Sequence, residues 1–233
     1  MMKFRHTAQL RHTCKGVLLA VILLILVNLW GRPVFADHDS SIIFRWAFVY
    51  QGKDEISKPI DYSKSVVRLE SGDRLKIYLK PLSACYFYLY LHDSQKNLYL
   101  LFPEDFTFFD KNLQIARKYD LPGGNSWFYL DDNSGIEVFY LIVSDQRLQS
   151  LKDSTKRYLE GRANQRDLQN ITYKHRVLDE IKRIIKESSY LSDASEKPIA
   201  VAGDFRGIRE EEELNGVSIE ATNIYVKTIR LAH

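Results

Sequence analysis

Short alternating runs of apolar and polar residues between Ile42 and Ser144 constrain the fold more than any other feature of the chain. The clearest run is RLKIYLK, in which Leu75, Ile77 and Leu79 share one face, while charged residues and a tyrosine occupy the other. A period of two is typical of a half-buried β-strand. Six or more such runs, separated by turn-forming residues, predict an antiparallel β-sandwich or barrel-like domain.

The connections between these runs predict two hairpins. One joins ACYFYLYLHD to NLYLLF through SQK, and the other joins SWFYL to IEVFYLIVS through DDNSG. The polar segment QGKDEISKPIDYSK contains Gly52 and Pro59, so we expect a linker without regular structure there.

The period changes from two to a helical one over residues 145–192. A first helix is expected to end at Gly161, and its apolar positions are Leu148, Leu151, Tyr158 and Leu159. A second helix carries a longer apolar stripe, formed by Ile171, Val177, Leu178, Ile181, Ile184 and Ile185. We expect this stripe to pack on the domain's own sheet; the alternative is that it docks a partner.

Strand character returns over residues 198–231, in IAVAG and VSIEATNIYVKTIRL, after an expected loop SSYLSDASEKP. The fold class is therefore mainly β, of the α+β type, with a two-helix insertion and a returning C-terminal strand. Residues 37–233 are expected to form a single domain, with a strand-rich core over residues 42–144.

Residues 1–36 have the order of parts of a secretory signal peptide. A basic leader precedes an apolar run at residues 16–30, and Val34 and Ala36 place small residues before a cleavage site. We expect a periplasmic or extracellular protein. The alternative is an uncleaved inner-membrane signal anchor, although the run is shorter than the roughly 20 residues that span a bilayer comfortably.

Removing this leader changes the charge balance. Five of the 33 Lys and Arg residues lie in it, which leaves 28 against 30 Asp and Glu, a formal charge of −2. Nucleic-acid binding needs a concentrated basic face, so we do not expect it. Cys85 is then the only cysteine, and it is expected to be a small buried hydrophobe; the alternative is a nucleophile.

Several of these segments carry a resemblance to a known family. LESGDRLKIYLKPLSACYFYLYLHDSQKNLYLLFPE, followed by YDLPGGNSWFYLDD and GIEVFYLIVS, resembles the bacterial domain of unknown function 4384 over roughly residues 42–150. The resemblance implies an extracytoplasmic β-rich domain. It implies no known activity and no catalytic residue.

No catalytic or metal-binding motif stands out. The histidines beyond the leader, His38, His92, His175 and His233, are scattered without metal-ligand spacing, and the chain has no G-x-S-x-G motif or phosphate-binding loop. We expect no cofactor and no metal, and interpret the protein as a binding or scaffolding module of the bacterial cell envelope. The alternative is an envelope hydrolase whose carboxylates meet on folding, with Asp131, Asp132 and Glu137 as candidates.

Tyrosine is abundant, with 14 in the chain. Tyr86, Tyr88 and Tyr90 share one face of a strand whose other face includes Phe87 and Leu89. We expect a buried core or a cross-strand ladder. The alternative is a binding face for an envelope protein or a cell-wall glycan, since tyrosine offers a flat apolar body and a polar tip. Membrane contact is expected only through an uncleaved signal anchor.

Overall fold

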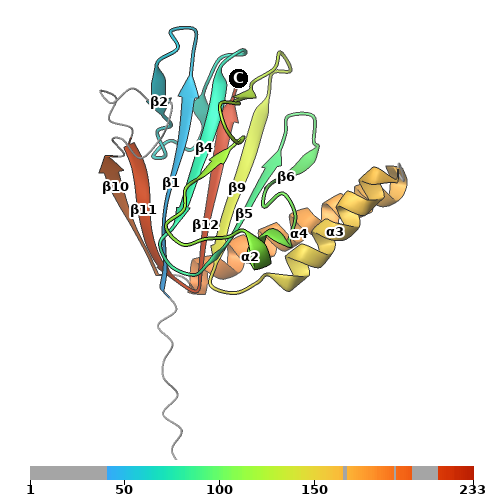
Figure 1. Ribbon diagram of the computed structural model, residues 1–233. Coiled ribbons are helices and arrows are strands. Elements are labelled where there is room, and N and C mark those ends of the chain that lie inside the picture. The colour runs from blue at the N-terminus through green and yellow to red at the C-terminus, as the bar shows by residue number, and fades with distance from the viewer. Residues whose placement is uncertain (1–40, 165–166, 192, 201–214) are drawn as a thin grey trace, which may run out of the picture. The chain divides into compact units, whose positions relative to one another are not determined.

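The computed structural model describes residues 41–164, 167–191, 193–200 and 215–233 (Figure 1). The predicted signal at residues 1–36 lies outside these ranges. Two sheets dominate the described part. The first has the order β10 (Ala194–Ala200), β11 (Asn215–Thr222), β1 (Ser41–Gln51), β4 (Arg74–Pro81) and β7 (Tyr119–Leu121), with β2 (Ser57–Pro59) beside β1 and β8 (Phe128–Tyr129) beside β4.

The second sheet has the order β3 (Val67–Arg68), β12 (Ile224–Ala232), β9 (Ile136–Ser144), β5 (Tyr86–His92) and β6 (Leu98–Phe102). All described strand pairs are antiparallel except β12 with β3. The mainly β, α+β class is confirmed, and of the two predicted architectures the sandwich-like one is observed.

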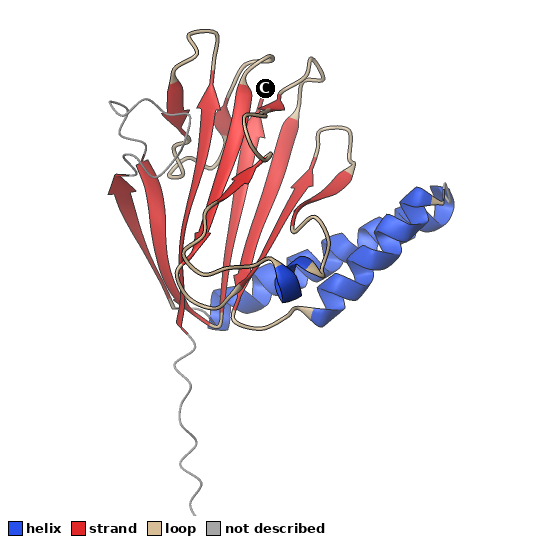
Figure 2. Ribbon diagram, viewed as in Figure 1, coloured by secondary structure: helices blue, strands red, loops and turns tan. Residues whose placement is uncertain are grey.

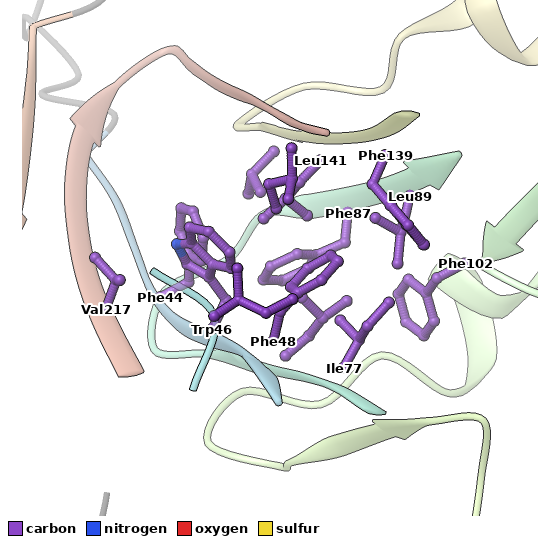
Figure 3. Packing of buried hydrophobic residues seen from close by; sticks show 14 of the residues in the cluster. Phe44, Trp46, Phe48, Ile77, Phe87, Leu89, Phe102, Phe139, Leu141 and Val217 are labelled. Atoms are coloured by element: carbon purple, nitrogen blue, oxygen red, sulfur yellow. The ribbon is translucent and has the colours of Figure 1, made fainter. Parts of the chain in front are cut away.

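The main core lies between the two sheets (Figure 3). Alternating positions of β1, β4, β5 and β9 point their aromatic and aliphatic side chains into this layer, as the period of two predicts. Phe44 of β1 meets Phe87 of β5 edge to face, with ring centroids 5.3 Å apart, and Phe48 meets Phe139 of β9 at 5.4 Å. These aromatic pairs pack one sheet against the other.

A second core lies on the outer face of the second sheet. It is covered by the helices α3 (Gln149–Ala163) and α4 (Asp167–Leu191). The helices gather on one side of the strands, with the short α2 (Phe108–Lys111) nearby (Figure 2). Val177, Ile181 and Ile184 of the predicted stripe are buried there, so the stripe packs on the domain's own sheet. Ile171, at the start of the stripe, is exposed.

Gly161 does not end the first helix, because α3 continues to Ala163. Gly161 is buried where α3 meets α4, and a β-carbon there would lie 3.4 Å from Cδ2 of Tyr173. The residue is small because α4 passes close by, so the expected stop signal is a packing position.

Three other expectations about connections were wrong. The predicted linker contains β2, which pairs with β1, and the predicted loop before IAVAG contains the end of α4 and the start of β10. The second hairpin does not form, because β8 pairs with β4 in the first sheet while β9 belongs to the second. Alternation of apolar and polar residues shows that a strand has a buried face, but it does not identify the strand with which it pairs.

The run VSIEATNIYVKTIRL also differs from the expected single strand. It divides into β11 and β12 at Asn223, whose positive φ of 60° forms the turn. The two strands enter different sheets. None of the helices in the described ranges has the length and apolar character needed to cross a membrane.

Candidate functional site

Tyr86, Tyr88 and Tyr90 were expected to form a buried core or a cross-strand ladder, with a binding face as the alternative, and they lie beneath the helical layer. Tyr88 is 1% exposed and Tyr90 is fully buried, whereas Tyr86 is half-buried. The hydroxyl of Tyr88 accepts a hydrogen bond from the Leu148 amide at 3.0 Å, and that of Tyr90 lies 2.9 Å from the Thr155 hydroxyl. In this arrangement a ligand would reach Tyr88 and Tyr90 only if α3 moved away, so their part in binding remains a prediction.

Cys85 lies on the opposite face, in the core between the sheets. Its side chain is 2% exposed, and burial raises the pKa of the thiol to about 12. The thiolate, which is the reactive form, is therefore scarce at neutral pH. This environment is that of a packing residue.

A small cavity is found where β8, the start of β9 and the β5–β6 turn come together. Its volume is about 240 Å³. Its apolar walls are formed by Leu75, Leu91, Phe128, Leu130 and Phe139. Its carboxylate and imidazole side chains come from Asp93, Asp131, Glu137 and His233. Concave sites with apolar walls and a few converging polar groups are typical of ligand pockets.

Glu137 and His233 form the buried centre of this pocket. Glu137 is 8% exposed, and its Oε1 accepts a hydrogen bond from the Ser94 amide at 3.1 Å. Nε2 of His233 lies 3.5 Å from the same oxygen. The His233 side chain is only 1% exposed, and its Nδ1 has no hydrogen-bond partner among the described residues.

Backbone pairing brings these two residues together. β12 runs antiparallel to β9 up to the pair Ala232 and Ile136, and His233 continues the ladder by exchanging two backbone hydrogen bonds with Gly135, at 3.0 and 3.2 Å. Figure 1 shows the end of β12, marked C, beside the loop that leads into β9. The register of this strand pair places the imidazole next to Glu137.

Gly135 allows the β5–β6 turn to approach. A β-carbon at this position would lie 2.5 Å from Cβ of Ser94, a separation that real atoms do not adopt. With glycine there, the Ser94 hydroxyl donates to the Asn133 carbonyl at 3.2 Å, and the Ser94 amide reaches Glu137. The glycine therefore helps to hold the acceptor carboxylate in place.

The two aspartates that line the pocket stabilise turns by accepting hydrogen bonds. Asp131 accepts hydrogen bonds from the backbone amide and the side-chain amide of Asn133, at 2.9 and 2.7 Å, and Asp93 accepts the equivalent pair from Asn97, at 2.6 and 3.0 Å. The bonds from Asn133 are the main cause that lowers the pKa of Asp131, so this carboxylate stays ionised.

The carboxylates suggested for a hydrolase are only partly brought together. Asp131 and Glu137 line the same pocket, whereas Asp132 is not part of the lining; both aspartates are exposed. The described residues contain no group of three or more His, Cys, Asp or Glu side chains that could hold a metal ion.

His233 is the pocket residue that sequence reasoning missed. It lies 96 positions after Glu137, and no motif connects the two. The sequence did predict a returning C-terminal strand. Locating His233 from that prediction would also have required the strand's pairing partner and its register.

The fold and pocket define a class: a mainly β, two-sheet domain with a helical pair on one outer face. Residues 68–147 match the model of the family described as "Domain of unknown function (DUF4384)". The resemblance inferred from the sequence is thereby confirmed over residues 68–147. The matched range contains Asp93, Asp131 and Glu137 but not His233. A search of curated proteins found no match, and neither did a search of solved structures.

Proposed function

We propose that the protein is a binding or scaffolding module of the bacterial cell envelope, and that it holds its partner through the pocket around Glu137 and His233. The observation that carries the proposal is the buried His233 imidazole, which lines a concave site and has a ring nitrogen without a hydrogen-bond partner among the described residues. Buried polar atoms normally have partners, so an unpaired one in a pocket suits a ligand.

The envelope location is supported by two features of the sequence. Residues 1–36 have the composition of a secretory leader, and the resemblance read from the sequence implies an extracytoplasmic domain. An envelope protein or a cell-wall glycan is the kind of partner that such a module meets.

Site-specific crosslinking in intact cells tests this proposal. A photoreactive amino acid in place of Tyr129, which is 68% exposed and lines the pocket, should capture a defined envelope component. The same amino acid at Tyr190, which is 80% exposed on α4, is the control. Glu137→Gln should abolish the capture at Tyr129. A product that persists in Glu137→Gln, or that also forms from Tyr190, would argue against the pocket.

An envelope hydrolase is the second candidate, because Asp131, Glu137 and His233 line one cavity. A histidine next to a carboxylate can serve as a general base. However, Asp131 and Glu137 already accept backbone hydrogen bonds. Incubation of the purified protein with isolated cell-wall material tests this candidate: soluble fragments that appear with the wild type and are absent with Glu137→Gln would favour the hydrolase over the binding module.

A further inference from the structure

We propose that the pocket recognises a protonated primary amine carried on a short aliphatic stem, such as the side chain of a lysine. This inference rests on the proposed binding function and names the chemistry of its ligand. It follows from the acceptors in the pocket, from its charge, and from the size and nature of its walls.

His233 supplies a hydrogen-bond acceptor in the lining of the pocket. The Nε2 atom of His233 lies 3.5 Å from Glu137 Oε1, so a proton on this nitrogen would be close to a carboxylate. A neutral imidazole that carries its proton on Nε2 has an acceptor at Nδ1. That Nδ1 is buried and has no partner among the described residues. A ligand that donates an N–H would satisfy this atom.

The charge of the lining selects the kind of donor. Asp93, Asp131 and Glu137 line the pocket, and none of its described lining residues is a lysine or an arginine. Asp131 stays ionised, because the bonds from Asn133 lower its pKa. A cation gains from these carboxylates, whereas an anion is repelled by them. An ammonium group fits because it supplies three donors and no acceptor.

The walls limit the rest of the ligand. A volume of about 240 Å³ is below the range of roughly 300–1,000 Å³ that holds drug-sized molecules. Leu75, Leu91, Phe128 and Phe139 supply apolar surface on which methylene groups can pack. A single aliphatic amine therefore fits better than an extended chain.

Nuclear magnetic resonance of the purified protein tests the inference directly. The probe is Nα-acetyl-lysine methylamide, and its matched control is the same compound acetylated on the side-chain amine, which removes the charge. The first should shift the ring signals of His233 in a saturable manner at millimolar concentration. The control should leave them unchanged. Equal shifts from both compounds, or no shift from either, would overturn the assignment.

Two variants sharpen the result. Glu137→Gln keeps the shape of the side chain and removes its charge, so it should weaken lysine-probe binding by about tenfold or more. Asp132→Asn removes an exposed carboxylate outside the pocket and should change the affinity less than about twofold. Equal losses in both variants would mean that only general charge attraction is involved, and would contradict the proposed pocket.

The outcome is separable from that of the crosslinking experiment. If Tyr129 captures a partner in cells while the amine probe fails to bind, the binding function stands and the ligand chemistry is wrong. If the probe binds and no partner is captured at Tyr129, the amine site stands and the proposed module function is wrong.

Discussion

The two faces of the sheet formed by β3, β12, β9, β5 and β6 are built by different rules. On the inner face, Phe87 and Leu89 of β5 pack against the first sheet. The outer face carries Tyr88 and Tyr90 from the same strand, under α3 and α4. Both faces are buried, but within β5 only the outer face carries hydroxyl groups.

The two faces hold their neighbouring layers, the first sheet and the helices, by different interactions. Apolar contact is non-directional, so the inner face stabilises the sandwich through its buried area. On the outer face, the Tyr88 and Tyr90 hydroxyls bond α3 at the Leu148 amide and the Thr155 hydroxyl, and Tyr158 of α3 donates to the Leu98 carbonyl at 2.9 Å. Buried hydroxyls need partners, so these bonds favour one placement of α3 on the sheet.

Removing a ring from the inner face should have the largest effect. We expect Phe87→Ala to lower the free energy of unfolding by about 3–5 kcal/mol, because it leaves a cavity between the sheets. Urea denaturation measures the change. Tyr129→Ala, at an exposed position, should stay within about 0.5 kcal/mol of the wild type. Comparable losses at the two positions would mean that the inner face is not the main core.

Alkaline pH should destabilise both faces, in two steps. Burial raises the pKa of Cys85 from 9.0 to about 12 and that of Tyr88 from 10.0 to about 12. The unfolded chain therefore loses these protons first, and the free energy of unfolding falls as the pH rises, by up to about 1.4 kcal/mol per pH unit for each group. Cys85→Ala should remove the part that begins near pH 9 and leave the part that begins near pH 10. An identical slope in the variant would exclude the thiol as a source.

Removing a hydroxyl from the outer face should have a smaller, local effect. Tyr88→Phe takes the acceptor from the Leu148 amide and should lower the free energy of unfolding by about 1 kcal/mol. Amide hydrogen exchange should become faster in the first turn of α3 and remain unchanged in β1. Faster exchange in both elements would mean that the hydroxyl stabilises the whole domain and not only the packing of α3 on the sheet.

The smallest expected effect is a gain. Gly161→Ala should raise the free energy of unfolding by about 0.5–1 kcal/mol, because alanine favours the helix interior and its methyl group would only touch Tyr173 at 3.4 Å. Gly161→Leu should destabilise, since its longer side chain would extend from a β-carbon that already touches Tyr173. Thermal unfolding of the two variants tests both signs, and a loss in Gly161→Ala would show that α4 lies closer than the distance indicates.

The sequence predicted what depends on local periodicity. The positions of β1, β4, β5, β6 and α4 followed from patterns of two and 3.6, and the apolar stripe around Ile181 was correctly placed against the sheet. Local periodicity did not identify the sheet to which each strand belongs: β8 and β9 were predicted to form a hairpin, yet they pair in different sheets. Asn223 was not recognised as the turn that divides β11 from β12.

The candidate site was only partly predictable, for the same physical reason. Asp131 and Glu137 were singled out because they flank one turn, and they do share a pocket. His233 joins them only through the register of β12 on β9. Long-range pairing sets that register, and the residues around His233 do not encode it.

The interior positions of β11 and β12 determine when each sheet can be completed. β11 lies between β10 and β1, and β12 lies between β3 and β9. As the chain is synthesised, β1 and β9 each wait for a neighbour that is made only with residues 215–232. Such late, long-range pairing slows folding and leaves strand edges open in the meantime. Each sheet therefore reaches its full set of strands only when residues 215–232 are available to pair.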